Sequence, residues 1–428
     1  MTTFDPAAIR HHFPALAQTD DHGQPLIFFD GPGGTQVPDA VIAAMSDYLT
    51  RRNANTHAPF TTSQRSDATL SAAHHALADL LNAPSPDEIV FGPNMTTLTF
   101  ALSRALARTW QPGDEVIVTR LDHDANIAPW LALAEQGIVI RWLDFDPADC
   151  TLRLDQLADL LNKRTRLLAV GGASNAVGTI NPLAEMARQA HEAGALMFVD
   201  AVHLAPHAAI DVQAIGCDFL ACSVYKFYGP HVGALWGRYD LLDRLPAYKV
   251  RPSDPQPPGK WMTGTQNHEG LAGAVAAVDY LAGVGETYGT AFAAAFPGFA
   301  GRRLHLKTGL DAIAAFERDL FTQLLDGLDA IPGARVYGIT DRQRLAERTP
   351  TAAIRLGDAG SGGRWHPLDL CARLGRHGIA SYAGHMYALA VIERLGPLEE
   401  GGVLRIGLSH YNTAAEVDTL LNLFEDLG

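Results

Sequence analysis

Between residues 88 and 237, seven short apolar runs alternate with amphipathic stretches, and this alternation restricts the fold more than any other feature of the 428-residue sequence. Each run has about the length of a buried strand, and the stretches between them, such as 182–193, have the spacing of helices that are apolar on one face. This order is typical of βαβ units, in which helices cover both faces of a mainly parallel sheet. The runs are EIVF (88–91), EVIV (115–118), IVIRWL (138–143), LLAV (167–170), ALMFVD (195–200), DFLACS (218–223) and GALWG (233–237).

The residue pattern changes in the rest of the chain. The proline-rich segment 251–259 breaks all periodicity and predicts a loop, and a helical pattern follows over 270–282. A stretch rich in Gly, Ala and Phe then leads to a long helical candidate at 310–330. Strand-like runs at 351–356 and 403–409 complete an α+β pattern.

These changes predict three parts. We expect a large α/β domain at residues 26–282, built on a mainly parallel seven-stranded sheet, and a smaller α+β domain at residues 283–428. Residues 1–25 are expected to form an N-terminal segment that packs against the smaller domain.

The charge balance restricts the partners. The chain has 47 acidic and 33 basic side chains, so its formal net charge is −14. Binding to phosphates requires clustered Lys and Arg, and the sequence has no such cluster, which argues against nucleic acid and anionic membrane surfaces as partners.

The compartment is predicted from three absences. No segment reaches the ~18 uninterrupted apolar residues of a membrane-spanning helix, and residues 1–16 lack the apolar core of a secretory signal. The four cysteines, Cys150, Cys217, Cys222 and Cys371, have no metal-type spacing, and a disulfide framework is not expected. We predict a cytoplasmic protein.

A lysine and an aspartate follow neighbouring apolar runs. Asp200 ends the strand-like run FVD, and Lys226 comes shortly after the run that ends in Ser223. The carboxyl ends of strands are where α/β sheets bind ligands. A desolvated lysine is nucleophilic and can form a Schiff base with pyridoxal phosphate, and an aspartate can keep the pyridine nitrogen protonated. The alternative is structural, with Lys226 reaching solvent and Asp200 capping a helix.

Other polar groups follow the same pattern. His123 comes after the run EVIV, where it could stack on a flat ring, and Asn175 follows LLAV and could offer its amide to a phenolic oxygen. His203 lies one turn beyond Asp200. Met95 and Thr96 open a helical run, and a helix N-terminus is a ready phosphate site. A structural histidine and a plain helix cap are the alternatives.

Together these residues carry a resemblance to a known family. The chain resembles the class V, fold-type I pyridoxal-phosphate enzymes from residue 28 to about residue 423, and within them the group-II cysteine desulfurases and selenocysteine lyases. The matching motifs are DHDANIAPW (122–130), SNAVGTINPL (174–183), VDAVH (199–203), DVQAIGCDFLACSVYKFYGP (211–230), TGT (263–265) and LRIGLSHYNT (404–413).

The resemblance implies a role for each cofactor residue. Lys226 would bind pyridoxal phosphate covalently, Asp200 would pair with the pyridinium nitrogen, and His123 would stack on the ring. Asn175, together with His203 and Tyr225, would approach the cofactor, and Thr96 and Ser223 would hold the phosphate with Met95 beside them.

The resemblance also implies a substrate site and an assembly. Thr265 would reach the phosphate in a partner subunit, which makes a homodimer the expected assembly. Arg405 would grip the α-carboxylate of an amino-acid substrate. Tyr382, His385 and Tyr387 would line the substrate side.

The chain departs from the desulfurase pattern at several positions. Desulfurases have Gln where this chain has His203, and His where it has Tyr225. Their active-site loop, of the type Arg-Thr-Gly-His-His-Cys, supplies a thiol that accepts sulfur, whereas residues 382–387 read Tyr-Ala-Gly-His-Met-Tyr. Tyr387 therefore replaces the persulfide cysteine, and a phenol cannot take over the chemistry of a thiolate.

Two other motifs point to different functions. The stretch 31–34, Gly-Pro-Gly-Gly, resembles a nucleotide loop, but Pro32 breaks the pattern GxGxxG and no GK[ST] follows. His203 and His207 have metal-like spacing, and residues 122–124 add possible ligands for a metal hydrolase, although Pro206 disfavours a regular helix there. We predict neither a nucleotide site nor a metal site.

The sequence thus predicts a pyridoxal-phosphate enzyme that acts on an α-amino acid. Without a persulfide cysteine, C–S lyase chemistry by β-elimination is favoured over transamination or epimerisation. A family member that binds the cofactor without catalysis is a further alternative. The tyrosines hint at a larger or aromatic substrate.

Overall fold

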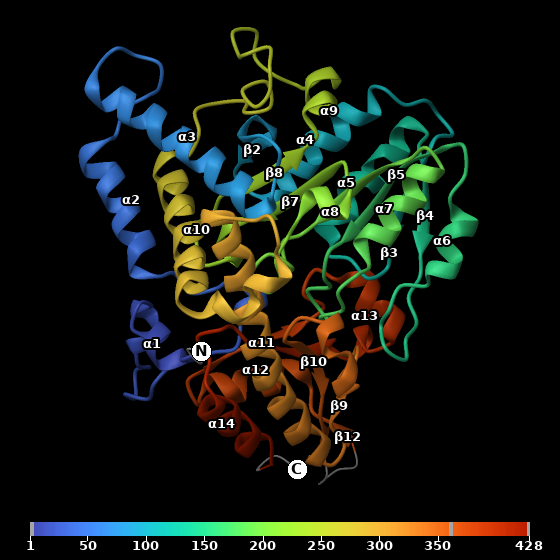
Figure 1. Ribbon diagram of the computed structural model, residues 1–428. Coiled ribbons are helices and arrows are strands. Elements are labelled where there is room, and N and C mark those ends of the chain that lie inside the picture. Colours follow the sequence, from blue (N-terminus) through green and yellow to red (C-terminus); the bar gives the residue numbers. More distant parts are fainter. Residues whose placement is uncertain (1–3, 359–362, 426–428) are drawn as a thin grey trace.

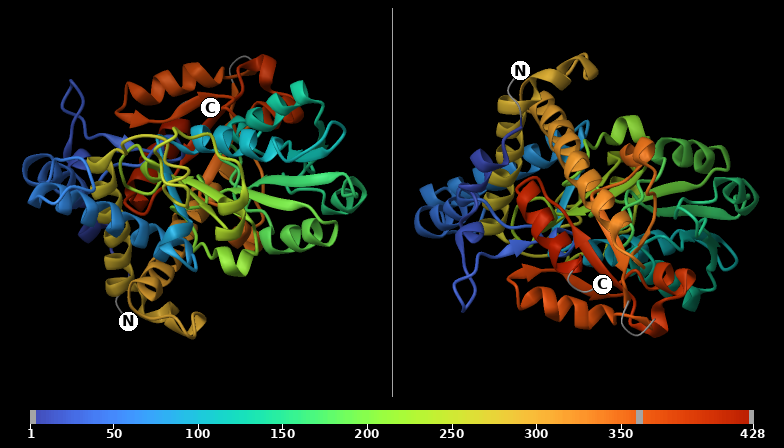
Figure 2. Two further views of the ribbon diagram at one scale, coloured as in Figure 1. Left: turned by 90° about the horizontal axis from the view of Figure 1, so that it is seen from above. Right: turned by 90° about the horizontal axis from the view of Figure 1, so that it is seen from below.

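The computed structural model describes residues 4–358 and 363–425. Figure 1 shows a large sheet with its helices in the upper part of the view and the orange and red C-terminal elements below it. Figure 2 shows the molecule from above and from below, and in the view from below the orange and red C-terminal elements lie toward the viewer. Residues of both regions line one cleft. This shared cleft is the feature of the fold that matters most for function.

The helices differ widely in length, from single turns to a helix of 30 residues. They are α1 (Pro6–Arg10), α2 (Asp39–Arg51), α3 (Thr61–Leu81), α4 (Met95–Ala107), α5 (Ala128–Leu131), α6 (Leu154–Leu160), α7 (Leu183–Glu192), α8 (Val212–Ile215), α9 (Tyr239–Arg244), α10 (His268–Tyr288), α11 (Gly301–Ala330), α12 (Pro367–Gly375), α13 (Leu389–Leu395) and α14 (Ala414–Glu425).

The strands form two main sheets and two short pairs. They are β1 (Ile27–Phe28), β2 (Ile89–Gly92), β3 (Glu115–Thr119), β4 (Val139–Leu143), β5 (Thr165–Gly171), β6 (Leu196–Asp200), β7 (Phe219–Ser223), β8 (Gly233–Gly237), β9 (Arg335–Tyr337), β10 (Thr351–Arg355), β11 (Gly357–Asp358), β12 (Gly363–Arg364), β13 (Ile379–Ala380), β14 (Tyr382–Gly384) and β15 (Val403–Gly407).

The large sheet contains all seven predicted strands, in the order β2-β8-β7-β6-β5-β3-β4. The pairs among β3 to β7 are parallel, and β8 runs antiparallel to both of its neighbours. The predicted fold class, an α/β protein with a mainly parallel seven-stranded sheet, is therefore confirmed.

Successive residues of the strands face opposite helix layers, as the period of a strand requires. Val116 and Val118 of β3 pack in the cluster with α4 and α5, whereas Ile117 between them packs with α3, α7 and α10 on the other face. Because both faces are covered, the strands other than the edge strand β4 are almost continuous apolar runs. This double burial explains why the runs were readable in the sequence.

The C-terminal sheet is antiparallel and consists of β9, β10, β14 and β15, in the order β14-β15-β10-β9. Its apolar face packs against α11 and α14 around residues such as Phe321, Ile354 and Ile406. Tyr382 of β14 lies opposite Arg405 of β15, so the register places these two candidate substrate residues side by side.

The long helices differ from the prediction at their ends. α10 continues to Tyr288, past the expected domain boundary between residues 282 and 283, so the division into domains stays a proposal. α11 begins at Gly301 rather than near residue 310. The added turns of α11 cross α10 closely, because a Cβ at Gly285 would overlap the backbone of His305.

The N-terminal segment contacts C-terminal elements. Arg10 forms an ion pair of 2.8 Å with Glu416 and donates to the carbonyl of Tyr411, and β1 pairs in parallel with β13. After β1, a short 3₁₀ helix (Gly31–Gly33) carries Pro32 to the cleft. Among the described residues, no helix is long and apolar enough to cross a membrane.

Candidate active site

A cleft of about 1040 Å³ opens at the carboxyl ends of the parallel strands, between the large sheet and the C-terminal sheet. Its walls contain every predicted site residue except Thr265: Met95, Thr96, His123, Asn175, Asp200, His203, Ser223, Tyr225, Lys226, Tyr382, His385, Tyr387 and Arg405. The parallel sheet brings these residues together because its strand ends meet at one edge.

Lys226 lies in the 3₁₀ turn (Val224–Lys226) that follows β7. Its Nζ donates a hydrogen bond to the carbonyl of Pro32 and lies 4.9 Å from the centre of the Tyr225 ring. Burial and, next, the positive charge of Arg405 lower the pKa of this amine from 10.5 to about 7. At neutral pH much of the amine is therefore unprotonated, as a nucleophile or a proton acceptor must be.

Asp200 is the last residue of β6 and is buried beside the cleft. One carboxyl oxygen, Oδ1, accepts the N–H of Val202 at 2.9 Å, and the other has no hydrogen-bond partner among the described residues. Burial raises the pKa of Asp200 to about 6. An oxygen left free in this way can pair with a cationic ring nitrogen.

Asp122 is a cleft residue to which sequence reasoning gave only a metal-binding alternative. Its Oδ1 accepts the N–H of Gly171 at 2.7 Å, and its Oδ2 accepts the amide of Asn126 at 3.0 Å. Burial, followed by repulsion from Asp200, raises the pKa of Asp122 well above its usual range. Its place directly before His123, at the end of a strand, was the signal that could have identified it.

His123 caps the short 3₁₀ helix (Asp124–Asn126) through its Nδ1, which accepts the N–H of Ala125 at 2.9 Å. The ring proton is therefore on Nε2 when the imidazole is neutral. Burial, with added repulsion from Lys226, lowers the pKa of His123 to about 4, so the ring is neutral at pH 7. Tyr387 stacks on it, with 5.6 Å between ring centres and 20° between planes.

The loop that carries Tyr387 is fixed against the large sheet. The carbonyl of Tyr387 accepts the N–H of Asp124 at 2.7 Å, and the carbonyl of Met386 accepts the amide of Asn175 at 2.9 Å. Met386 and Tyr387 both have positive φ angles, 53° and 55°, which non-glycine residues seldom adopt. Such strain is commonly found at ligand sites.

The N-terminus of α4 points into the cleft beside Ser223. The Met95 N–H donates to Oγ of Ser223 at 3.1 Å, and Asn94 caps the helix by accepting the Thr97 N–H at 2.8 Å. The Thr96 N–H between them has no hydrogen-bond partner among the described residues. Free N–H groups at a helix N-terminus are suited to bind phosphate.

Arg405 of β15 provides a buried positive charge at the opposite side of the cleft. One nitrogen, Nη1, donates to the carbonyl of Asn175 at 2.9 Å, and the guanidinium lies 5.8 Å from the centre of the Tyr382 ring. Burial lowers the pKa of Arg405 to about 10, which leaves it charged at neutral pH. A fork with remaining N–H groups can bind a carboxylate.

One predicted site residue lies away from this arrangement. Thr265 is exposed and does not line the cleft of its own chain. His203 and His207 are 5.3 Å apart between ring centres, but no group of three His, Cys, Asp or Glu residues could hold a metal ion within residues 4–358 and 363–425.

None of the four cysteines, all of which lie in the described part of the chain, lines the cleft. Burial raises the pKa of Cys150 and of Cys222 to about 12 and raises that of Cys217 as well. Cys371 is half-buried in α12, where its thiol donates to the carbonyl of Ser381 at 3.2 Å. These thiols are not placed to react in the cleft.

Residues 27–420 match the family model for class-V aminotransferases. The chain belongs to the class-V aminotransferase family. Cysteine desulfurase from Dickeya dadantii (strain 3937) is 33% identical over 96% of this chain and 94% of its own length. Probable cysteine desulfurase from Xylella fastidiosa (strain 9a5c) is also 33% identical, over 98% of this chain and 95% of the relative.

Solved structures agree with this membership. The cysteine desulfurase CsdA (S-sulfonic acid) from Escherichia coli superposes with a TM-score of 0.82 at 28% identity, covering 100% of this chain and 99% of the other. The apo cysteine desulfurase from Thermococcus onnurineus NA1 gives a TM-score of 0.84 at 26% identity, covering 100% and 99%. Class-V aminotransferases of this type depend on pyridoxal phosphate, so the chain is a pyridoxal-phosphate-dependent enzyme of fold type I.

The cleft of this class-V chain fits that cofactor chemically. Asn175 has a buried Oδ1 with no hydrogen-bond partner among the described residues, and a ligand group with a proton would satisfy it. A neutral lysine, a carboxylate with one free oxygen and a helix N-terminus complete the donor and acceptor set that a phosphorylated pyridine aldehyde requires.

Proposed function

We propose that this protein is a C–S lyase that uses pyridoxal phosphate to remove a sulfur substituent from the β-carbon of an α-amino acid. The observation that carries the proposal is the combination of a buried Lys226, whose pKa is about 7, with a cleft that no cysteine lines. The family relatives are named cysteine desulfurases. The difference proposed here is that sulfur leaves as a free thiol or sulfide.

Each residue has a proposed role toward the cofactor. Lys226 would hold it covalently, Asp200 would pair with its ring nitrogen, and the neutral ring of His123 would stack on its face. Thr96, Ser223 and the Met95 backbone would hold the phosphate. When bound, the cofactor would supply an electron sink for the negative charge that forms at the α-carbon.

Arg405 positions the substrate. Its free N–H groups would form a bidentate pair with the α-carboxylate, and Tyr382 beside it would limit how far the substrate can turn. With the carboxylate fixed on the C-terminal sheet, the α-carbon is presented to the large-sheet side of the cleft, where Lys226 lies.

Lys226 is the proposed base. With a pKa of about 7, its amine would be unprotonated in about half of the molecules at pH 7 and could then take the α-proton. The bond between the β-carbon and sulfur breaks, the electron pair leaves with sulfur, and water hydrolyses the remaining unsaturated amino acid to a keto acid and ammonia.

The purified protein should show a visible absorbance band with pyridoxal phosphate that borohydride bleaches, and Lys226→Ala should lose the band and all turnover. A Lys226→Ala variant with full activity would refute the assigned role. A protein that binds the cofactor but converts no amino acid would instead be the catalytically silent form.

Product analysis separates the possible reactions. Incubation with cysteine and its S-alkyl derivatives should give keto acid, ammonia and thiol or sulfide in equal amounts. Alanine as the product would indicate desulfurase chemistry, a new amino acid formed from an added keto acid would indicate an aminotransferase, and inversion at the α-carbon would indicate an epimerase.

A matched variant tests the absence of a sulfur-accepting thiol. Cys371→Ser changes the half-buried cysteine that is nearest in sequence to the Tyr387 loop, and turnover should remain within about twofold of the unmodified enzyme. A loss of turnover on the scale of Lys226→Ala would mean that Cys371 takes part in sulfur transfer, which contradicts a free-thiol lyase.

A further inference from the structure

His203 forms part of the cleft wall but has its hydrogen bonds on the side of the C-terminal sheet. It follows Asp200 in the large-sheet part of the chain and is 4% exposed. Its Nε2 lies 3.1 Å from Oγ1 of Thr349 and 3.0 Å from Oγ1 of Thr351. Its Nδ1 has no hydrogen-bond partner among the described residues.

The surroundings of His203 keep it neutral. Burial and then the charge of His207 lower its pKa well below the usual range, with further contributions from Arg405, Lys226 and His123. The edge of the His207 ring packs against it, and Nδ1 of His207 bonds Oε2 of Glu317 at 2.7 Å. A neutral imidazole has one N–H and one nitrogen with a lone pair. The hydrogen bonds of His203 therefore depend on which of its two ring nitrogens has the proton.

The hydrogen bond of the Thr349 hydroxyl indicates which nitrogen of His203 has the proton. This hydroxyl donates to the carbonyl of Gly178 at 3.3 Å, so its single proton is already used. The contact between Thr349 and His203 is therefore a hydrogen bond only when Nε2 is the donor, and the Thr351 oxygen at 3.0 Å can accept from the same N–H. With the proton on Nε2, Nδ1 has the lone pair.

The two threonines are held rigidly. The Thr349 N–H donates to the carbonyl of Gly178 at 2.9 Å, and the buried guanidinium of Arg348 donates to the carbonyls of Val177 and Thr351 at 3.1 and 2.5 Å. Gly178 has a φ of +82°, and a Cβ there would meet the carbonyls of Thr349 and Thr351 at 2.9 Å. This glycine therefore permits the close contact between the two parts of the chain.

We propose that Thr349 and Thr351 are positioning residues that fix the Nε2–H tautomer of His203 and so present its Nδ1 to the cleft as a hydrogen-bond acceptor. The inference rests on the proposed function only in placing a ligand in that cleft. It follows that the ligand group beside His203 is a hydrogen-bond donor, either a hydroxyl or an ammonium. The C-terminal sheet thereby controls the chemistry of a large-sheet residue.

The test is the ring ¹⁵N spectrum of the protein with labelled histidine, recorded with bound pyridoxal phosphate. The His203 signals are identified by their loss in His203→Gln. In the unmodified protein Nε2 should be protonated and Nδ1 should not. In the double variant T349V/T351V the proton should move to Nδ1 or divide between the two nitrogens.

Two controls isolate the hydroxyl groups. T349S/T351S keeps both hydroxyls and should keep the original tautomer. Thr179→Val makes the same substitution at a buried threonine that pairs with Arg348 but does not contact His203, and its spectrum should be unchanged. If T349V/T351V does not fold, the test compares the ¹⁵N spectrum of Thr351→Val with that of the unmodified protein.

Turnover gives a second measure. In T349V/T351V the turnover should fall and the Kd for pyridoxal phosphate should rise by about tenfold, because the bound ligand loses one hydrogen-bond acceptor. A His203 protonated at Nδ1 in the unmodified protein, or an unchanged tautomer in T349V/T351V, would overturn the inference. Absence of the cofactor band would refute the proposed function alone, because the tautomer can then be read from the spectrum of the protein without cofactor.

Discussion

The chemistry of the cleft depends on how far Lys226 is desolvated. Its pKa is about 7 because burial disfavours the charged amine and Arg405 repels it, while Asp200 and Asp30 oppose the shift. An ordinary lysine would be almost fully protonated at pH 7. One residue thus becomes reactive through its surroundings, without any change in covalent structure.

This pKa predicts a pH dependence for cofactor attachment. Only the neutral amine reacts, so the rate of covalent attachment of pyridoxal phosphate to Lys226 should rise as the pH increases through about 7 and level off about one unit higher. Stopped-flow absorbance between pH 5.5 and pH 9.5, a range of about four units around that value, measures it. A rate that continues to rise up to pH 9.5 would show that the amine is not desolvated.

A variant of Arg405 tests the direction of the pKa shift of Lys226. Arg405→Gln removes the positive charge that lowers the pKa of Lys226, so the midpoint of the pH profile should move upward. Because burial is the larger cause, the midpoint should remain below that of a free lysine. A downward shift would contradict the electrostatic account of the site.

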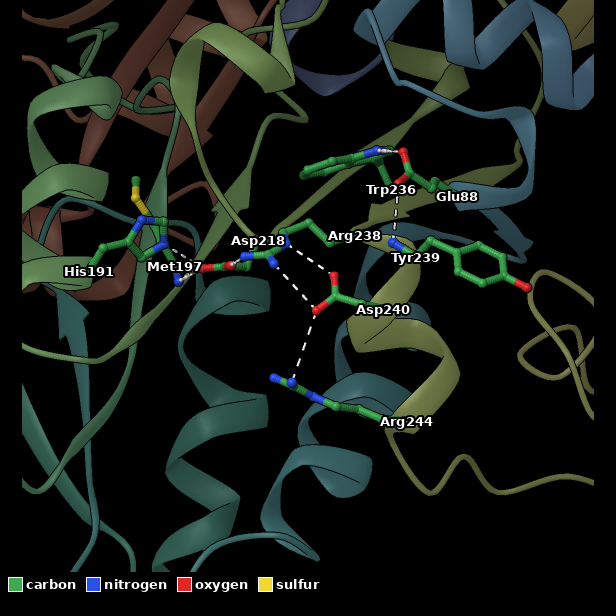
Figure 3. A network of polar contacts seen from close by, with 9 residues as sticks. All are labelled: Glu88, His191, Met197, Asp218, Trp236, Arg238, Tyr239, Asp240 and Arg244. Atoms are coloured by element: carbon green, nitrogen blue, oxygen red, sulfur yellow. Dashed lines mark hydrogen bonds and ion pairs between the residues drawn. The ribbon is translucent and has the colours of Figure 1, made fainter.

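At the scale of elements, a polar network holds the sheet at the end away from the cleft. Figure 3 shows Asp218, which precedes β7, between His191 of α7 and Arg238 after β8. The Asp218 carboxylate accepts from His191 and from the N–H of Met197 at 2.8 Å each, and from Arg238 at 3.1 Å. It thereby ties β6, β7 and β8 together, and the strand ends at the cleft depend on this alignment.

The network predicts a contrast between two aspartates. Asp218→Ala leaves the buried N–H of Met197 without an acceptor and should lower the free energy of unfolding by about 2–3 kcal/mol. Asp240→Ala removes a half-exposed partner of Arg238 in the same network and should cost less than ~0.5 kcal/mol. Urea unfolding of both variants measures the difference, and equal costs would mean that Asp218 contributes no more than a surface ion pair.

At the scale of the whole molecule, the cleft needs both sheets, and a second chain is expected to complete it. Thr265 is exposed and lies outside the cleft of its own chain. We predict a homodimer in which Thr265 reaches the phosphate site of the partner subunit. Light scattering should therefore give twice the chain mass of 45.9 kDa.

A mixed dimer tests the contribution of Thr265. The test combines a Lys226→Ala chain with a Thr265→Ala chain in one dimer. If Thr265 reaches the phosphate site of the partner subunit, one of the two clefts has both residues intact. The cofactor affinity of that cleft should match the affinity of the unmodified enzyme. If Thr265 acted within its own chain, no cleft in the mixed dimer would be intact. Separately tagged chains purified together make the comparison direct.

Local pattern and family motifs were sufficient to predict the large sheet and most cleft residues. They were less informative at α11, whose first turns contain Arg302, Arg303 and Lys307. These charges are typical of a solvent-exposed helix face. Lys307 is nevertheless buried and forms an ion pair of 3.0 Å with Asp211. The partner is 96 residues away, so no local pattern could have indicated it.

The sequence by itself determined the sheet, because burial on both faces makes the strands inside the sheet continuous apolar runs. It also determined which polar groups follow those strands. Only the tertiary structure decided how the cleft is closed. Thr349 and Thr351 meet His203 across 146 and 148 residues, and Tyr387 stacks on His123 from a distant loop. Such contacts depend on the packing of two sheets in space, and neither hydrophobic periodicity nor spacing along the chain encodes them.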